Sequence, residues 1–324
     1  MHRRKFIREL SLGGLALQAS GSFAFPAEAG CRDRPVTVGW ITDVHHGFCP
    51  DASRRLEAFI EEAGRVKPDF ILQGGDFCHP TQEARAFMRI WEGFKGRRVH
   101  VLGNHDMDKG TKREIMDLWQ MPERFYGFEE GGFHFIVMDC NHILKDGRQV
   151  PYAFGNFYID PLHRDLVDPE QIEWLKAEID RARKPCVIIS HQSFDEVWTG
   201  KTVPNRAAVR EVIDAANEKG GGGKVVACIC GHHHLDHHMV IRDVHYIHIN
   251  SASYYYVGDG FGMDRGMATY EEPLYCFITF DPRGRISVSG REGRFRSPSP
   301  LEKSFPDAAR ISASISDRKL VLHG

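Results

Sequence analysis

The chain has 324 residues, of which 42% are hydrophobic and 27% charged, and its formal net charge is -2 at pH 7. This is ordinary globular composition, and the length suits one large α/β domain. Because the charge is close to neutral, no long-range positive field surrounds the protein. The composition therefore argues against general nucleic-acid binding and against attraction to an anionic membrane.

The first 29 residues resemble an export signal. Basic residues at positions 3–8 precede an apolar stretch at 10–19, and small residues end at Ala29 in the pattern of a cleavage site. The two adjacent arginines, with a phenylalanine two residues on, are similar to a twin-arginine signal. The apolar stretch is shorter than the ~20 residues of a membrane-spanning helix. We therefore expect removal of the signal, no transmembrane segment afterwards, and a periplasmic or other extracytoplasmic protein. An amphipathic helix, a membrane anchor and lipidation of Cys31 are the alternatives.

Apolar runs bounded by turn residues alternate with segments of helical periodicity in the first third of the chain. The predicted order is strand, helix, strand, helix, strand, at residues 36–42, 52–66, 70–73, 82–94 and 99–102. This βαβαβ order predicts a largely parallel sheet.

The second half is richer in neighbouring strands. A strand at 133–138 precedes a helix at 169–183 that Asp168 caps, and the remaining elements are a strand at 186–190, a helix at 204–219, a strand at 225–230 and hairpin-like pairs at 239–249 and 275–289. This pattern predicts two sheets packed together with helices outside. From residue 291 the sequence turns polar, which predicts a poorly packed C-terminal extension.

Eight cysteines are present, an even number that in an exported protein would allow disulfides. Four of them lie in apolar runs that read as core strands: Cys186, Cys228, Cys230 and Cys276. Buried free thiols are therefore the better interpretation.

Polar clusters follow five of the predicted strands. They are Asp43 with His45, then Asp76, then Asn104 with His105 and Asp106, then His191, and finally His232 with His234. Residues two apart at a strand end project to the same side. In open α/β sheets ligand sites gather at the carboxyl ends of strands, so the five clusters are expected to converge on one crevice.

These motifs, D-x-H, G-D, G-N-H-D, H and G-H-x-H, resemble those of the calcineurin-like metallophosphoesterase family over roughly residues 36–290. The resemblance implies an α/β fold, a four-layer α/β/β/α sandwich of two mixed sheets with helices outside. It implies two metal sites that share Asp76: Asp43, His45, Asp76 and His234 for one, and Asp76, Asn104, His191 and His232 for the other. Oxygen and imidazole ligands without thiolate suit divalent or trivalent Mn, Fe or Zn ions.

The resemblance also implies the chemistry, which is hydrolysis of a phosphate ester. A hydroxide bridging the two metals would attack phosphorus, with His105 as general acid or charge stabiliser and Asp106 orienting it. A purely structural His105 in a tight turn is the alternative. We expect the neighbouring histidines to lie outside the ligand set, namely His46, His233, His237 and His238. Asp139, Asn141 and His142 also follow a strand, either as a polar loop or in a supporting role.

Residues after Asp76 depart from two branches of the family. The run Phe77 to Pro80 lacks the extended second motif of the protein phosphatases. Purple acid phosphatases lack the histidine of the first motif, which is His45 here, and they have a tyrosine where this chain has His79. The remaining motifs look like the branch of class III cyclic-nucleotide phosphodiesterases and manganese-dependent ADP-ribose diphosphatases. Substrate choice would lie in two aromatic-rich loops, 141–168 and 251–270, whose rings either stack on a base or pin the loops to the surface.

The expected organisation is a signal peptide at 1–29, a catalytic domain at 30–290 and the polar extension at 291–324. The expected function is exported hydrolysis of a small phosphate mono- or diester. A phosphodiesterase for cyclic nucleotides or nucleotide diphosphates, a nuclease, and a non-catalytic scaffold on the same fold are alternatives. The sequence leaves the oligomeric state open.

Overall fold

Two six-stranded mixed sheets form the centre of the protein in this computed structural model, which describes residues 34–197, 202–306 and 308–322. The strands of the first sheet are, in spatial order, β16 (Arg318–Val321), β15 (Arg285–Ser289), β14 (Cys276–Asp281), β1 (Val36–Ile41), β2 (Phe70–Gln73) and β3 (Arg97–His100). Those of the second are β10 (His237–Ile241), β11 (Val244–His248), β9 (Val225–Cys230), β8 (Cys186–Ile189), β5 (Phe133–Val137) and β4 (Tyr126–Glu130). In the first sheet the parallel strands β1, β2 and β3 occupy one end and antiparallel strands the other. In the second sheet the parallel pairs occupy the centre, and an antiparallel strand lies at each edge.

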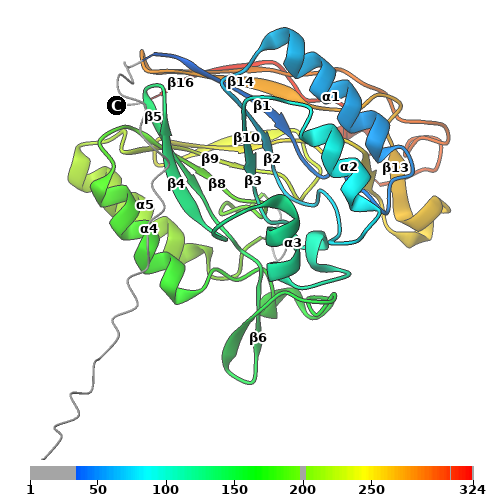
Figure 1. Cartoon of the computed structure of the whole chain (residues 1–324), viewed down its shortest axis with the longest axis horizontal. Helices are drawn as coiled ribbons and strands as arrows, with labels where there is room; N and C mark the ends of the chain where they lie inside the picture. The colour runs from blue at the N-terminus through cyan, green and yellow to red at the C-terminus, as the bar shows by residue number, and fades with distance from the viewer. Residues whose placement is uncertain (1–33, 198–201, 307, 323–324) are drawn as a thin grey trace, which may run out of the picture.

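Helices cover the outer face of each sheet (Figure 1). The first sheet carries α1 (Ala52–Val66), α2 (Ala84–Trp91) and α3 (Lys112–Trp119), whose apolar side chains pack with its outer face. The second carries α4 (Pro169–Arg181) and α5 (Arg206–Gly220). The predicted four-layer sandwich with helices outside is confirmed.

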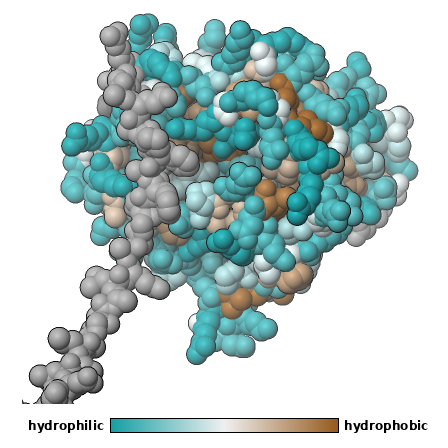
Figure 2. All heavy atoms as spheres, in the orientation of Figure 1, coloured by the Kyte–Doolittle hydropathy of each residue, from teal (hydrophilic) through white to brown (hydrophobic). Residues whose placement is uncertain are grey.

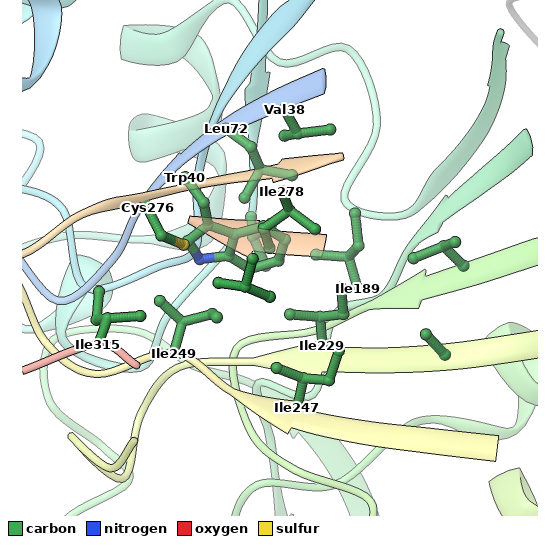
Figure 3. Close-up of a cluster of buried hydrophobic side chains, with 14 of the residues drawn as sticks. Val38, Trp40, Leu72, Ile189, Ile229, Ile247, Ile249, Cys276, Ile278 and Ile315 are labelled. Carbon is green, nitrogen blue, oxygen red and sulfur yellow. The ribbon is translucent and has the colours of Figure 1, made fainter. Parts of the chain in front are cut away.

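The main hydrophobic core lies between the two sheets. In Figure 3, Trp40 and Leu72 of the first sheet face Ile229 and Ile247 of the second. Strands whose side chains are buried on both faces read as continuous apolar runs, which is why the sequence revealed β1, β2, β8 and β9 so clearly. The face of the molecule seen in Figure 2 is mostly hydrophilic.

Smaller elements project from this frame. A hairpin of β6 (His142–Lys145) and β7 (Arg148–Pro151) extends away from the sheets (Figure 1), and a second pair joins β12 (Tyr254–Tyr256) to β13 (Met267–Thr269). The short 3-10 helices are η1 (His105–Met107), η2 (Pro161–His163), η3 (Asp259–Phe261), η4 (Asp264–Gly266) and η5 (Ala308–Arg310).

Helix starts follow local capping chemistry. The Asp168 side chain accepts a hydrogen bond from the amide of Gln171 at the start of α4, as expected. The sequence reading missed α3, which begins with a capping box between Thr111 and Glu114. With only eight residues, α3 is too short for its periodicity to stand out.

The C-terminal segment differs from the expectation of a poorly packed extension. Its strand β16 pairs antiparallel with β15 at the edge of the first sheet, and Ala313 and Ile315 are buried in the core between the sheets. Ile315 also bridges the backbone of Arg291. The expectation of poor packing is therefore wrong for residues 311–321, because a few apolar side chains among the serines suffice to attach an edge strand.

All seven cysteines of the described residues are free and buried, which confirms the prediction of free thiols for this part of the chain. The predicted export signal and Cys31 lie outside the described residues. Among the residues that are described, no helix has the length and apolar character needed to cross a membrane.

Candidate metal centre

The five predicted strand-end clusters meet where the carboxyl ends of the two sheets adjoin. Asp43, Asp76 and Asn104 follow β1, β2 and β3 of the first sheet, while His191 follows β8 and the pair at 232 and 234 follows β9 of the second. Main-chain hydrogen bonds hold neighbouring clusters in register, from the Asp43 amide to the Gly75 carbonyl at 3.0 Å and from the His45 amide to the Asp76 carbonyl at 2.9 Å. The predicted convergence is found.

One group of ligand atoms comes from Asp43, His45 and His234, which are all buried and whose ligand atoms lie within 4.8 Å of one another. His234 Nε2 lies 3.2 Å from Asp43 Oδ1. It lies equally close, 3.2 Å, to His45 Nε2. These separations would allow the three side chains to bind one ion.

A second group comes from Asp76, His191 and His232. His191 Nε2 lies 3.2 Å from Asp76 Oδ2. The two groups adjoin, because His45 Nε2 of the first is 3.9 Å from the same Asp76 oxygen. Asp76 thus stands between the groups, where a bridging ligand would stand, and buried Asn104 follows the next strand.

The protonation pattern of two histidines suits a cation. His191 Nδ1 is 2.7 Å from the Gly74 carbonyl oxygen, and His234 Nδ1 is 2.6 Å from the Tyr254 carbonyl oxygen. Because a carbonyl oxygen only accepts, each Nδ1 carries the hydrogen. The lone pair of each Nε2 in the neutral ring is then directed into the site.

Several buried ligand atoms have no hydrogen-bond partner. They are Asp43 Oδ1, Asn104 Oδ1 and His191 Nε2. Unpaired buried polar atoms are rare in folded proteins and call for an explanation such as an ion. The other Asp43 oxygen is satisfied by the Thr42 hydroxyl at 2.6 Å and the His232 amide at 3.2 Å. The donor set therefore fits a pair of metal ions.

Five of these residues have left-handed backbone conformations. The φ angles lie between 51° and 65° for Asp43, His45, Asp76, His232 and His234. Such conformations cost non-glycine residues roughly 1–3 kcal/mol each and cluster at functional sites.

Gly75 shows how tightly the strand ends meet. Its φ is +100°, and a Cβ atom there would lie 2.4 Å from His191 Nδ1. Only glycine therefore allows β2 and β8 to approach closely enough to share the site.

The carboxylates and imidazoles of the site shift one another's pKa values. Burial raises the pKa of Asp76, but the charges of His191 and His105 outweigh it, so the pKa lies well below its ordinary range. Burial lowers the pKa of His191, but Asp76 and Asp43 raise it to about 10. A cation at this position would take the place of the His191 proton.

The predicted partner of His105 is corrected by the structure. Asp106 accepts hydrogen bonds from main-chain amides, including those of Asp76 at 3.0 Å and Phe77 at 2.7 Å. Asp108 instead lies against the ring, with Oδ2 2.8 Å from His105 Nδ1. The expectation that Asp106 orients His105 is therefore wrong, since its carboxylate is committed to the turn below Asp76.

Two of the polar residues after β5 are buried and fully engaged in hydrogen bonds or ion pairs. Asp139 is paired with Lys112 and Arg124 in a buried ionic network. The Asn141 side chain accepts a hydrogen bond from Gln192 Nε2 at 2.8 Å and donates one to the Leu102 carbonyl oxygen at 2.8 Å. Asn141 thereby links the residues beside His191 and Asn104.

The histidines expected outside the ligand set have other contacts. His46 stacks on Phe87 at 4.4 Å between ring centroids, and the His233 ring stacks on His248 at 5.7 Å. His238 Nε2 lies 2.9 Å from His245 Nδ1. His237 has an edge contact with His248. None of the four belongs to either ligand group among the described residues.

Aromatic side chains surround the candidate centre. Tyr254 lies 5.0 Å from the His45 ring, and Tyr158, 62% exposed, reaches the Asp108 carboxylate. Other loop aromatics are buried, namely Tyr152, Phe157 and Tyr255, whereas Phe154 and Tyr256 are exposed. Phe48, which the sequence reading missed, lies 5.5 Å from the His105 ring. Phe48 lies three residues after His45, at the same strand end, and this position could have indicated in the sequence that its ring lies near the site.

Two adjoining groups of aspartate and histidine at the carboxyl ends of two packed sheets are the arrangement of a metal-dependent phosphoesterase. Residues 36–236 match the family model described as calcineurin-like phosphoesterase. The chain belongs to this family.

Comparison with solved structures gives the same fold. A dimetal phosphatase from Danio rerio superimposes with a TM-score of 0.61 at 15% identity, covering 90% of this chain and 100% of that chain. GAP50, described as the anchor in the inner membrane complex of Plasmodium, gives a TM-score of 0.55 at 14% identity over 90% of each chain. At these identities the likeness concerns the fold alone. No curated protein matches the sequence.

Proposed function

We propose that this protein is a dinuclear-metal hydrolase of small phosphate esters. Asp43, His45, Asp76 and His234 would hold one ion, and Asp76, Asn104, His191 and His232 the other. The observation that carries the proposal is the set of unpaired buried ligand atoms in two adjoining groups. When bound, a metal pair supplies a nucleophilic water at neutral pH and neutralises charge on the phosphate. Mn, Fe and Zn suit the oxygen and imidazole donors.

His105 would act on the leaving group. Its ring lies 5.4 Å from the His45 ring and remains partly exposed, so a substrate bound at the centre can reach it. Burial lowers the pKa of His105, but Asp76 and Asp108 outweigh this, and the net shift is upward. A histidine that retains its proton near neutral pH can stabilise or protonate a departing oxygen.

Metal content and activity together test the proposal. Purified protein should contain about two transition-metal ions per chain by elemental analysis, as a two-metal site requires, and should hydrolyse p-nitrophenyl phosphate or its bis ester. His105→Ala should keep both metals and lose about 10²-fold or more in turnover. His163→Ala, on the exposed η2, is the matched control and should change neither. Two bound metals without hydrolysis of any ester in a broad panel would count against the enzymatic proposal.

A narrower candidate is a phosphodiesterase for cyclic nucleotides or nucleotide diphosphates. Phe48, Tyr158 and Tyr254 flank the centre, and aromatic rings in such positions can stack on a nucleobase. A substrate panel should then favour nucleotides over simple phosphate esters. Phe48→Leu should raise the KM for nucleotides and leave that for p-nitrophenyl phosphate unchanged. Equal changes in both would contradict base stacking.

A non-catalytic scaffold is the alternative from another class. GAP50, which shares the fold, is described as an anchor. The present chain has His105 and all seven expected ligand residues, which favours catalysis. A scaffold should lack a stoichiometric metal pair, so elemental analysis separates the two.

Export by the twin-arginine route is also part of the proposal. It rests on the order of charged, apolar and small residues in the first 29 positions. When the full-length chain is expressed in a bacterial host, the protein should appear in the extracytoplasmic fraction, shorter by the length of the removed signal. Replacing both Arg3 and Arg4 by lysine should keep the protein in the cytoplasm of the host. If the variant fractionates like the wild type, the twin-arginine route is contradicted.

A further inference from the structure

Residues 312–318, which we name the strap, follow η5 and include the first residue of β16. Ala313 and Ile315 are buried in the core between the sheets, which also holds Ile249 (Figure 3). The main chains of Ile315 and Arg291 exchange two amide hydrogen bonds of 2.8 Å. Because alternate side chains of an extended chain point to the same side, the two apolar side chains hold one face of the strap in the core.

The segment against which the strap packs has two glycines at the points of contact. A Cβ atom at Gly290 would overlap the Ile315 carbonyl oxygen, and one at Gly293 would lie 2.7 Å from the Ala313 carbonyl oxygen. The Gly290 amide also donates to Asp317 Oδ1 at 2.8 Å. Because glycine lets two main chains approach closely, the strap has a fitted seat rather than a loose contact.

One attachment of the strap holds the loop that follows His234. Arg318 Nη2 lies 2.5 Å from Asp236 Oδ1, and the Ser316 amide donates to Asp236 Oδ2 at 3.0 Å. The Ser316 hydroxyl donates to the same carboxylate oxygen. The side chains of the ion pair are only 13% and 9% exposed, which limits screening by water. Since Asp236 lies two residues beyond His234, the strap restrains the chain that carries this ligand.

A second attachment runs through the side chain of Asn250, which is 1% exposed. Its Nδ2 donates to the carbonyl oxygens of Ser312 and Ser314 at 2.9 and 3.0 Å. Its Oδ1 accepts from the Ser251 amide at 2.8 Å and from the Tyr270 hydroxyl at 2.9 Å. Two donors and two lone pairs are all that an amide side chain offers, so Asn250 is fully used in joining the strap to the segment after β11.

The segment after β11 continues from Asn250 to the candidate metal centre. The Ser251 hydroxyl donates to the Asp43 carbonyl oxygen at 2.9 Å, and His234 Nδ1 donates to the Tyr254 carbonyl oxygen at 2.6 Å. Both attachments of the strap thus lead to the first group of ligand residues, Asp43, His45 and His234. Within the described part of the chain, the strap has no hydrogen bond to Asp76, Asn104, His191 or His232.

We propose that the strap sets the affinity of the first ligand group for its metal ion, with Asp236 and Asn250 as positioning residues. The inference rests on the metal pair of the proposed function. Asp43 and His234 have φ angles of 53° and 51°, and Asp43 Oδ1 lies 3.2 Å from His234 Nε2. When the strap is released, these residues leave their strained conformations, and the ion must order them again at a cost in affinity. The second group lacks these attachments, so the effect concerns one of the two ions.

Metal retention measures the effect for each ion. Manganese-loaded full-length protein is dialysed against a weak chelator, and elemental analysis then gives the number of ions per chain. At a chelator concentration that leaves the wild type with about two ions, Asp236→Asn and Arg318→Gln should retain about one, because the affinity of the first group falls about tenfold or more. Retention of both ions, or loss of both in parallel, would overturn the proposal.

Electron paramagnetic resonance of the same samples gives a second readout that does not depend on activity. Two adjoining Mn ions are magnetically coupled, so the dialysed variants should show the signal of an isolated ion where the wild type shows the coupled pair. The double variant of Asp236→Asn and Arg318→Gln should lose no more affinity than either single variant, because the two residues act as one ion pair. Arg318→Lys keeps the charge and should restore most of the retention. Additive losses would contradict the role of the pair.

Asp281→Asn is the matched control. Asp281 pairs with Arg285 in the turn between β14 and β15, at the end of β15 opposite to Val288, the residue beside Arg318. This variant should keep both ions. If Asp236→Asn does not fold, Ser316→Ala removes a single hydroxyl and should still lower the affinity of the first group about threefold.

The failure of the strap and the failure of the proposed function are distinguishable. If the wild type retains two ions and hydrolyses no ester, the proposed function fails, and metal retention in the variants still decides the role of the strap. If the wild type hydrolyses esters and every strap variant keeps both ions, the strap has no such role and the proposed function stands. A wild type that binds no metal pair would overturn both.

Discussion

The carboxylate of Asp106 lies beneath Asp76 and accepts a hydrogen bond from its main-chain amide at 3.0 Å. It accepts three further amide hydrogen bonds, from Phe77, Cys78 and Gly103. One side chain thus holds together the turns after β2 and β3, and with them the positions of two expected metal ligands. Because four main-chain amides donate to the two carboxylate oxygens, the side chain at position 106 must act only as an acceptor.

Asp106→Asn should therefore destabilise the protein. The amide nitrogen of asparagine would face two main-chain N–H groups, leaving buried donors unsatisfied at a cost of about 2–3 kcal/mol. Urea unfolding should reveal this loss, and metal affinity should fall with it. Asp117→Asn, on the exposed face of α3 where Asp117 pairs with Arg113, should change the free energy of unfolding by less than about 1 kcal/mol. Equal stability of the two variants would contradict the assigned role of Asp106.

Removal of the metals should lower thermal stability. Without a cation, the left-handed backbone at Asp43 and His45 and the unpaired ligand oxygens remain uncompensated. An ion at a hundred times its dissociation constant stabilises a folded protein by about 2.7 kcal/mol. Chelator-treated protein should thus melt several degrees lower in calorimetry and recover when Mn is added. If neither the chelator nor added Mn changes the melting temperature, the metals make no structural contribution.

The buried guanidinium of Arg55 should be a stability determinant. It is fully buried and donates to the Ala252 and Glu272 carbonyl oxygens at 3.0 and 3.1 Å, which attaches α1 to the segment behind Tyr254. Arg55→Lys should cost about 3 kcal/mol, because lysine cannot reproduce these forked hydrogen bonds. Arg54→Lys, at an exposed neighbour, is the control and should be nearly neutral in chemical unfolding. A neutral Arg55→Lys would show that the attachment is dispensable.

Acid sensitivity should depend on Asp139. Burial raises its pKa, but Lys112, His142 and Arg124 outweigh this and hold the pKa of the folded state below the usual 3.8. A carboxyl whose pKa is lower in the folded state stabilises the protein above its unfolded pKa, and that stability is lost as the pH falls through the folded pKa. The free energy of unfolding of metal-free protein should fall below about pH 4. Asp139→Asn, less stable at neutral pH, should lose less over that window, and parallel pH profiles would refute the assignment.

The elements and the strand-end positions of the candidate ligand residues could be predicted from the sequence because their signals are local. Helix α1 and strands β2 and β9 begin and end at the predicted residues, since buried strands and amphipathic helices have distinct periodicities. The convergence of Asp43, Asp76 and Asn104 followed from strand order alone, because the carboxyl ends of parallel strands share one edge.

The partners of these residues were decided by the tertiary structure. Asp106 and Asp108 follow His105 by one and three residues, and only the chain path through η1 determines that Asp108 meets the ring while Asp106 meets the turn. Tyr158 reaches His105 from 53 residues away. Strand β16 attaches to a sheet whose other strands end more than twenty residues earlier. Contacts of this kind depend on how distant segments pack, and no local pattern of residues encodes them.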